Sequence, residues 1–594
     1  MPRITANSAS LKKAFPQEYR DLFSRSEIVC SAPGNFYWSG EYAVRYGGIG
    51  IKQNLPLRTY VGVEAPKPGK PEINSIQYYI PSKRSFARHP AGSLPGTKKI
   101  LSHLKGYLAK ASPGARLPAF TILMEVPPGC GLSASASLAA SLSAALHLYL
   151  KKLTVSEINR LSATPTTHLL KDPAFNTVFR LAWELEDTIH GGGRASSGIG
   201  PFASLNASIY PIIYLREPRP ATGGDFRFWG IKMEELFSLA HKPSWPIDFG
   251  LIYSGDAGET SAIIAGFESI KKAIEEDLAS VKRDFERHQV PMPELYPSEQ
   301  EELWRSLMWE PKIFSLVTLA AFKNLFAHGF SENALKKLFK SINIVQRSLS
   351  FIDVSSHIID YLCLTLERET IKLHDIHGAG AKLTGRGKSG DVLFAVAYHG
   401  LRDTIDALIA RMRRETGEDF YLDYASWLDG FEEEGVKVEQ SLAEGIYSEF
   451  ISRGALEIRH VNRQGTSSTR LYSVEQFNED KPAMDVVFDP AKHKIYLAGK
   501  HLTSRELRSA SATIELLRIL LARLGQPVPN KELPTSSYTA DRNELQSKII
   551  TPLSHAVQKH LKADLNLKVS GPIRNFTVTL APGGVDFYVI DKVF

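Results

Sequence analysis

Cysteine is scarce in this sequence, which holds only Cys30, Cys130 and Cys363 among its 594 residues. Their odd number and wide separation exclude a disulfide framework and a metal site built from clustered thiolates. Long apolar runs are lacking as well, because the most apolar stretch, residues 134–150, is short and interrupted by serines. Residues 1–15 contain lysines without an apolar core behind them, so they do not indicate a secretory signal. We therefore expect a cytoplasmic protein without a membrane-spanning segment.

A strong charge of either sign is also missing. The chain carries 71 Lys and Arg against 64 Asp and Glu, which gives a formal net charge of +7. Nearly all of this excess lies at the C-terminal end, where residues 481–594 hold 16 basic and 10 acidic side chains. The hydrophobic fraction of 43% and the charged fraction of 23% are those of an ordinary globular protein. A chain of this length predicts about three folding units.

The order of strand and helix patterns indicates a mixed fold. Short apolar runs between glycine and proline turns predict strands over residues 28–63. The β-branched run TILMEV, residues 121–126, predicts a strand that a glycine turn connects to a long Ala/Ser/Leu helix. A helix is expected over residues 179–190, ended by the glycines that follow, and helical periodicity dominates residues 262–366. A strand, a glycine loop and a second strand then precede a helix over residues 401–415.

The turn PPGCGLSASAS, residues 127–137, is the segment best suited to binding an anion. Its glycines let the backbone approach a ligand, its serines offer hydroxyl groups, and the following helix directs a partly positive N-terminus toward the same place. A Ser/Ala helix packed closely beneath a tight turn explains the same residues equally well. The tripeptide Gly387-Lys388-Ser389 is not a P-loop, because Lys382 replaces the glycine required five residues earlier.

Three motifs in a fixed order carry a resemblance to a known family. They are SAPGNFYWSGEYAV, PPGCGLSASAS and GAGAKLTGRGKSG, and the match spans roughly residues 28–414. Together they resemble the signature motifs of the GHMP kinases, the family of galactokinase, homoserine kinase, mevalonate kinase and phosphomevalonate kinase. The resemblance implies an α+β fold, with a ribosomal S5-like ATP-binding domain over residues 1–215 and a ferredoxin-like domain over residues 216–430.

Within this family the sequence is most similar to the mevalonate and phosphomevalonate kinases. The segments ELEDTIHGG (184–192), SSGIG (196–200), LIYSGDAGETS (251–261) and DVSSHIID (353–360) resemble stretches of that branch. The resemblance implies a kinase that uses ATP and Mg²⁺ to phosphorylate a small molecule, either mevalonate or a related hydroxylated or phosphorylated metabolite.

The resemblance also assigns residues to a nucleotide and metal site. Ser135 and Glu186 are implied to hold magnesium, which prefers hard oxygen ligands such as a hydroxyl and a carboxylate. Without the resemblance, a solvated helix carboxylate would be the favoured interpretation of Glu186. The implied ATP-binding residues are Pro128, Gly129, Gly131, Leu132, Ser133, Ala134, Ser135 and Ala136 in the middle loop, with Thr384, Gly385 and Gly387 in the late loop.

The resemblance also implies residues that contact the substrate. His190 lies one turn beyond Glu186, where a C-terminal helix cap is the favoured interpretation. Glu41 either contacts the substrate or completes a turn. The implied substrate-binding residues are Glu41, Tyr42, His190, Ser197 and Gly198.

The sequence departs from the family pattern at two positions that matter for catalysis. Mevalonate-type kinases carry a lysine in the first motif and an aspartate after the Ser-Gly pair, and Asn35 and Gly200 stand at these positions here. Neither an amide nor a glycine can accept a hydroxyl proton or supply a positive charge. Asp256, Asp187 or Arg194 could approach the site from neighbouring segments. Two interpretations remain. The chain is a kinase of altered mechanism, since positioning dominates phosphoryl transfer, or it is a nucleotide- or metabolite-sensing regulator of little or no activity.

After a poorly periodic connector over residues 431–480, residues 481–594 predict opening strands, helices over 504–524 and 541–561, and a late hairpin. This order of elements resembles the winged-helix effector domain of bacterial response regulators. Such a domain binds duplex DNA or a protein partner. Pro552 stands in the recognition stretch, where it would kink or shorten the helix. The residues expected to contact DNA are Arg542, Lys548, His555 and Lys559 on the helix and Arg574 on the hairpin.

Overall fold

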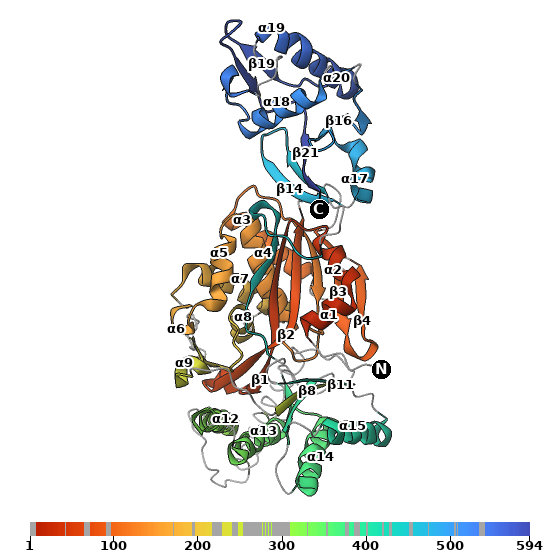
Figure 1. The fold of residues 1–594 in the computed structure, drawn as a ribbon. Coiled ribbons are helices and arrows are strands. Elements are labelled where there is room, and N and C mark those ends of the chain that lie inside the picture. Colours follow the sequence, from red (N-terminus) through yellow and green to blue (C-terminus); the bar gives the residue numbers. More distant parts are fainter. Residues whose placement is uncertain are drawn as a thin grey trace. The chain divides into compact units, whose positions relative to one another are not determined.

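The computed structural model divides into two compact units (Figure 1). The first comprises Met1–Glu18 and Ile28–Glu439, and the second comprises Tyr19–Glu27 and Gln440–Phe594. Of the helices that the structure describes, none is long and apolar enough to cross a membrane. The structure describes residues 7–41, 43–64, 72–90, 97–169, 171–192, 196–216, 228–239, 247–253, 276, 280, 283, 287, 309–328, 331–351, 354–374, 379–384, 392–398, 402–417, 421–426, 431–450, 456–472, 474–503, 506–507, 509–533 and 541–593.

An eight-stranded sheet, counted over the described residues, forms the N-terminal part of the first unit. Its strands follow the order β12-β1-β2-β5-β3-β4, in which β3 and β5 are parallel, while β6 joins β2 and pairs with β7. The β1–β2 register shifts between Pro33 and Asn35, which marks a β-bulge inside the first sequence motif. The strands are β1 (Ile28–Ser39), β2 (Ile49–Glu64), β3 (Ile73–Ile80), β4 (Ser85–Pro90), β5 (Ala119–Met124), β6 (Ile212–Arg216), β7 (Phe228–Lys232) and β12 (Lys437–Ser441).

Helices α4, α5, α7 and α8 cover one face of this sheet (Figure 1). The Ala/Ser/Leu side chains of α4 are buried on all sides, because their small size lets the helix pack against β1, β2 and α7 together. Helix α7 begins earlier than the predicted residue 179, since Asp172 caps it and Pro173 suits its first position. The helices of this part are α1 (Ser8–Ala14), α3 (Thr97–Ala111), α4 (Ala134–Tyr149), α5 (Val155–Ala163), α6 (Thr166–Leu169), α7 (Pro173–Ile189), α8 (Ile199–Leu205) and α9 (Met233–Phe237), with 3-10 turns η1 (Ala43–Tyr46) and η2 (Pro81–Lys83). Helix α2 (Pro16–Phe23) begins in the first unit, and its residues from Tyr19 on belong to the second.

His147, buried in α4, should make the fold weaken in mild acid. Its Nδ1 lies 2.7 Å from Ser143 O and its Nε2 lies 2.8 Å from the Tyr107 hydroxyl, contacts that satisfy a neutral ring. Burial lowers the pKa of His147 to about 4 from the ordinary 6.5. Because the unfolded ring takes up a proton at higher pH than the folded ring, stability is complete above 6.5 and falls by about 3 kcal/mol as pH drops toward 4.

Urea unfolding over this pH range measures the loss. His147→Gln cannot titrate, so its unfolding free energy should depend less on pH. Equal pH profiles for the two proteins would contradict the assignment.

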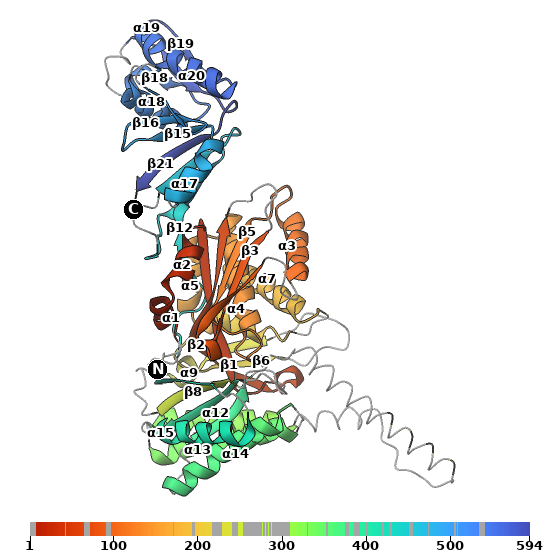
Figure 2. The same ribbon diagram turned by 90° about the vertical axis from the view of Figure 1, so that its right-hand side faces the viewer.

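A four-stranded antiparallel sheet of order β11-β8-β10-β9 forms the other described part of the first unit. Helices α12 to α15 lie along one of its faces in both ribbon views (Figures 1 and 2). The two sheets with their covering helices confirm the α+β class, and α15 confirms the helix expected over residues 401–415. The elements are β8 (Ile247–Tyr253), α12 (Trp309–His328), α13 (Glu332–Phe351), α14 (His357–His374), β9 (Ala379–Thr384), β10 (Val392–Tyr398), α15 (Arg402–Thr416) and β11 (Tyr421–Ser426).

The second unit holds, among its described residues, a six-stranded sheet of order β14-β13-β21-β15-β16-β17 and a three-stranded sheet of order β18-β20-β19. The segment 431–480, predicted as a connector, contributes β13 and β14 to the larger sheet. Leu456 and Ile458 of β13 are buried there in a core that they share with Met484, Val487 and Ile590. The elements are η3 (Leu442–Glu444), β13 (Leu456–Val461), β14 (Ser467–Tyr472), α17 (Val474–Asp480), η4 (Lys481–Ala483), β15 (Val486–Asp489), β16 (Lys494–Leu497), β17 (Lys500–His501), β18 (Val528–Pro529), η5 (Asn530–Glu532), β19 (Leu567–Ser570), β20 (Thr577–Leu580) and β21 (Phe587–Val593).

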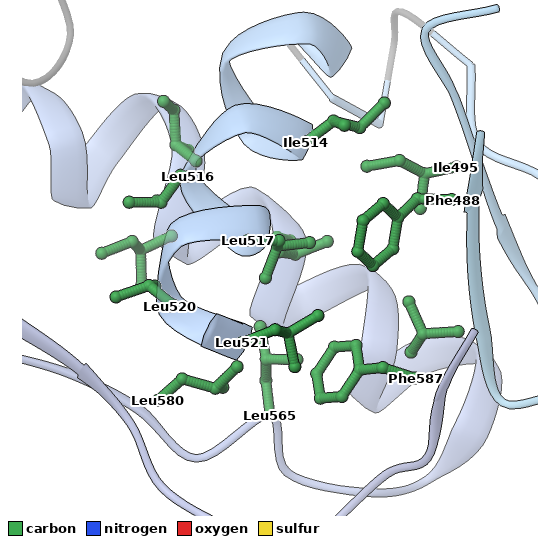
Figure 3. Close-up of a cluster of buried hydrophobic side chains, with 14 of the residues drawn as sticks. Phe488, Ile495, Ile514, Leu516, Leu517, Leu520, Leu521, Leu565, Leu580 and Phe587 are labelled. Atoms are coloured by element: carbon green, nitrogen blue, oxygen red, sulfur yellow. The ribbon is translucent and has the colours of Figure 1, made fainter. Parts of the chain in front are cut away.

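Leucine side chains of α18 (Ala510–Ala522) form the centre of the core of the second unit (Figure 3). In Figure 3, Leu517 points toward Phe488 of β15. The helix is shorter than the predicted range 504–524. The Ser509 hydroxyl accepts a hydrogen bond from Ala512 N in the first turn, and this cap fixes the start of the helix.

A continuous helical run follows over most of the predicted range 541–561. Helix α19 (Arg542–Leu545) leads into a π-helical segment (Gln546–Ile550) and then into α20 (Thr551–Leu561). Pro552 has no N–H to donate, and its ring crowds the preceding turn of the helix. That preceding turn is the wider π-helical segment, which gives the ring more room. The proline is therefore accommodated without ending the helix.

Candidate functional site

The glycine turn after β5 ends in the N-terminus of α4. Gly129, Gly131 and Ser133 adopt left-handed backbone conformations, with φ of 81°, 70° and 58°. Glycine adopts such angles without strain, whereas Ser133 holds one as the N-cap of the helix. Ser137 N donates to Ser133 O, which leaves the amides of residues 134–136 without acceptors inside the helix. An N-terminus of this kind attracts and binds anions.

The first motif packs directly against this turn. Asn35 N donates to Leu132 O at 3.1 Å. A Cβ atom at Gly34 would lie 2.9 Å from Leu132 O and 2.9 Å from Val126 Cγ2, so only glycine permits the approach. The first and middle motifs, which the sequence predicts to share a site, therefore lie in contact.

Lys52 of β2 enters the site between these two motifs. Only 2% of the residue is exposed, and its Nζ donates to Asn35 Oδ1 at 2.5 Å and to Ser133 Oγ at 3.2 Å. The same nitrogen lies 4.2 Å from the centre of the Tyr37 ring, within range of a cation–π interaction. A buried lysine thus connects the first motif to the glycine turn.

Sequence reasoning missed Lys52, because no motif contains it. The available signal is a lysine inside the strand pattern IGIKQNLPL, residues 49–57, between apolar residues on either side of the polar run KQN. Burial lowers the pKa of Lys52 to about 8, and the negative charges of Glu186 and Glu41 oppose that shift. The two carboxylates therefore act on the lysine through their charge.

Glu186 of α7 lies beside Gly200 of α8. Its side chain is buried, with 7% of the residue exposed, and its Oε2 accepts a hydrogen bond from Ser196 Oγ. Glu186 is therefore not a solvated helix carboxylate. A Cβ atom at Gly200 would lie 2.6 Å from Glu186 Oε1 and 2.8 Å from Ala136 Cβ. An aspartate at position 200 has no room unless α4, α7 or the glutamate shifts.

Asn35 and Gly200, the two predicted catalytic positions, lie together in the structure. Asn35 Nδ2 donates to Gly200 O at 3.3 Å and to Ser204 Oγ at 3.0 Å. Its Oδ1 meanwhile accepts from Lys52. The amide of Asn35 therefore links α8 to the buried ammonium, a role that needs both a donor and an acceptor.

Ser135, in the first turn of α4, is tied to the end of α7. Its Oγ lies 3.1 Å from His190 Nε2. His190 is the C-cap residue of α7, and its amide donates to Glu186 O. The structure therefore supports the cap interpretation of His190 and brings both implied magnesium ligands to the junction of α4 and α7.

The predicted substrate residues Ser197 and Gly198 form the turn into α8. Ser197 Oγ accepts from Ile199 N at 3.5 Å. Gly198 has a φ of 80°, and a Cβ atom there would lie 2.9 Å from the Trp183 ring. Both residues fix the turn that places Gly200, which is a structural role in this arrangement.

The described part of the late glycine motif contacts the first motif. Thr384 Oγ1, at the end of β9, accepts from Tyr37 N at 3.1 Å. Lys382 of the same strand forms a buried ion pair with Glu41 and donates to Tyr37 O at 3.1 Å. Burial raises the pKa of Glu41, although the charge of Lys382 opposes that shift. Glu41 Oε2 has no hydrogen-bond partner among the described residues.

Several predicted site residues lie outside the described residues. They are Tyr42, Arg194, Asp256, Gly385 and Gly387.

The chain resembles a mevalonate kinase in sequence. It is 22% identical over 272 residues to mevalonate kinase of Thermococcus onnurineus (strain NA1), a match that covers 44% of this chain and 68% of that protein. No protein-family model matches the chain. The sequence match agrees with the resemblance that the three motifs carry.

Solved structures with a similar fold include three kinases. Galactokinase of Lactococcus lactis complexed with galactose gives a TM-score of 0.42 at 15% identity and covers 72% of this chain and 98% of that chain. Mevalonate kinase of L. major in complex with R-mevalonate gives 0.41 at 17% identity, covering 68% and 98%. Phosphomevalonate kinase of Streptococcus pneumoniae in complex with phosphomevalonate and AMPPNP gives 0.40 at 14% identity, covering 67% and 100%.

The basic residues expected to contact DNA mostly have partners inside the second unit. Arg542 Nη1 donates to Gly571 O at 2.7 Å. Lys548 and Lys559 form ion pairs with Glu544 and Glu506, with N–O distances of 3.2 and 3.5 Å. The hairpin that carries Arg574 is β19 with β20, whereas β21 leaves it to pair with β13 and β15. The winged-helix likeness and the binding of duplex DNA or a protein partner stay predictions.

Proposed function

We propose that this chain is an ATP- and Mg²⁺-dependent small-molecule kinase of the GHMP type. One observation carries the proposal, namely that the N-terminus of α4 has a buried ammonium and a buried carboxylate beside it. Lys52 donates to the N-cap residue Ser133, and Glu186 and Ala136 both border Gly200. Amides and an ammonium neutralise phosphate charge, which is the main demand of phosphoryl transfer. The sequence likeness to a mevalonate kinase supports the same reaction class.

Magnesium fits the donor set at the junction of α4 and α7. Ser135 Oγ and the Glu186 carboxylate would hold the ion, since both are hard oxygen donors. The ion would bind the phosphate oxygens of ATP and offset their charge. Ser135 also contacts His190, and Glu186 also contacts Ser196, so both side chains are oriented before any ligand binds.

The acceptor in this proposal is mevalonate or a related hydroxylated or phosphorylated metabolite. Its support is the mevalonate kinase of Thermococcus onnurineus that the chain resembles. Glu41 Oε2, a buried acceptor without a partner among the described residues, would suit a substrate hydroxyl.

A coupled assay of ADP release, with mevalonate, phosphomevalonate and simple sugars as acceptors, tests the proposal. The wild-type chain should release ADP with one of them. Glu186→Gln keeps the shape but removes the charge, so kcat/KM should fall by about a hundredfold or more. Glu184→Gln on the same helix is the matched control, because Glu184 is half-exposed and pairs with His103, and it should keep the wild-type rate. Full activity of Glu186→Gln would contradict a metal-binding role.

A nucleotide-sensing regulator is the second candidate function. The observation that favours it is the absence of lysine at position 35 and of aspartate at position 200. ATP binding without ADP release for every acceptor would support the regulator over the kinase.

A further inference from the structure

The lysine missing from the first motif has a counterpart on the neighbouring strand. In the β1–β2 pairing, Asn35 lies opposite Asn54, and Lys52, two residues before Asn54 in β2, lies opposite Tyr37. Side chains two residues apart on a strand share a face, and a long side chain reaches the diagonal neighbour across the pair. This register lets the ammonium of Lys52 approach position 35 from β2.

We propose that Lys52 is the catalytic lysine of this chain and that its ammonium contacts the terminal phosphate of the nucleotide held by the glycine turn. The inference rests on the proposed kinase function. Its geometric basis is the pair of hydrogen bonds from Nζ to Asn35 and to Ser133, which place the ammonium at the first motif and at the phosphate-binding turn together.

A comparison with Lys382 separates a catalytic role from a structural one. Both lysines are buried in the same unit, but Lys382 forms an ion pair with Glu41 and donates to two backbone carbonyls. Lys52 donates only to an amide oxygen and a hydroxyl among the described residues. A buried charge without a direct counter-charge is costly. An anionic ligand at the glycine turn would supply the counter-charge that Lys52 lacks.

The hydrogen-bonding capacity of Lys52 leaves room for that ligand. An ammonium has three donors, and the contacts with described residues use two of them. The Tyr37 ring lies against the same ammonium and shields it from water. The remaining donor is thus available on a buried side chain, where a contact with phosphate is stronger than in bulk water.

Lys52 stabilises charge in this scheme and does not act as a base. The acceptor oxygen forms a bond to the γ-phosphorus while the bond from that phosphorus to the β–γ bridging oxygen breaks. ADP leaves with the electron pair, and the proton of a hydroxyl acceptor passes to water. The ammonium keeps its protons and offsets the charge on the transferred group.

Nucleotide binding tests the contact without requiring turnover. Lys52→Met should weaken binding of Mg·ATP at least tenfold relative to Mg·ADP, because only ATP carries the phosphate that the ammonium would contact. Lys232→Met is the matched control, since Lys232 is also buried and donates to Ser162 O. The control should leave the ATP-to-ADP affinity ratio at the wild-type value.

If Lys52→Met fails to fold, Lys52→Gln replaces it in the test, because glutamine keeps a polar side chain at this buried position. Lys52→Gln should also lower the ratio of ATP affinity to ADP affinity. An unchanged ratio in a folded Lys52 variant would overturn the assignment. A wild-type chain that bound neither nucleotide would instead contradict the proposed function, so the two failures are distinguishable.

Turnover supplies a second readout. Lys52→Met should lower kcat by about a hundredfold, whereas the double variant Asn35→Lys/Lys52→Met, which returns a lysine to the first motif, should recover at least a tenth of the wild-type kcat. A kcat of Lys52→Met within threefold of wild type would contradict a catalytic role.

Discussion

Replacing Lys382 with methionine is expected to lower the free energy of unfolding by about 3–5 kcal/mol, the cost of breaking a buried ion pair. The side chains of Lys382 and Glu41 are 0% and 2% exposed. Methionine fills a similar volume but leaves the carboxylate buried without its counter-charge. Denaturant unfolding of both proteins at neutral pH measures the difference.

The loss should depend on pH in a defined direction. Burial raises the pKa of Glu41, and Lys382 opposes this effect through its charge. In Lys382→Met the carboxyl group should bind a proton more readily when folded than when unfolded. A group with a raised folded pKa stabilises the fold at low pH and loses that contribution as pH rises. The destabilisation by Lys382→Met should therefore shrink in acid.

Two controls isolate the buried pair. The double variant Glu41→Leu/Lys382→Met removes both charges and should recover most of the lost stability. Lys105→Met breaks an exposed pair with Glu72 and should cost less than about 1 kcal/mol. If Lys382→Met also lowered the free energy of unfolding by less than about 1 kcal/mol, the Glu41–Lys382 pair would not be a main source of stability for the site.

Gly200→Asp, which restores the aspartate of the mevalonate branch, is expected to damage the site instead of activating it. The new carboxylate would stand against Glu186 Oε1, which lies 2.6 Å from the Cβ position, and against Ala136 of α4. Two carboxylates in one buried place repel each other, and the crowding adds to the cost. The free energy of unfolding should fall by about 3 kcal/mol or more, as for other buried unpaired charges.

Gly200→Ala separates crowding from charge. It adds only the Cβ atom, so it should cost about 1–3 kcal/mol, less than Gly200→Asp. Unfolding curves and the ADP-release rate should be measured for both variants. A Gly200→Asp protein as stable as wild type with a higher rate would contradict the packing of Gly200 against Glu186.

The features predicted correctly from the sequence are those formed by residues close together in the chain. The turn at 127–137 and its helix follow from glycines and small side chains in one short segment, and the structure places them as expected. Lys52 could not be found this way, because its role depends on the register of β2 against Asn35. The obstruction at Gly200 likewise depends on how closely α8 packs against Glu186. Local patterns predict turns and helices, whereas contacts between distant segments need the fold.

The C-terminal unit illustrates the same difference. Its helices were predicted from periodicity, and α18 and α20 confirm them with shifted ends. The strands β13 and β14 were predicted as a connector, because their alternating pattern is weak and β21, the other partner of β13, lies far along the chain. Strand β21 pairs with β13 and β15 instead of with the hairpin, and turn residues do not predict such a pairing between distant segments.

A crystal structure of the chain grown with Mg²⁺ and a non-hydrolysable ATP analogue tests the central claim most directly. The triphosphate should lie on the backbone amides of residues 134–136, with the metal at Ser135 and Glu186 and the terminal phosphate beside Lys52. A nucleotide bound elsewhere, or a turn that stays closed to it at saturating concentration, would contradict the kinase assignment.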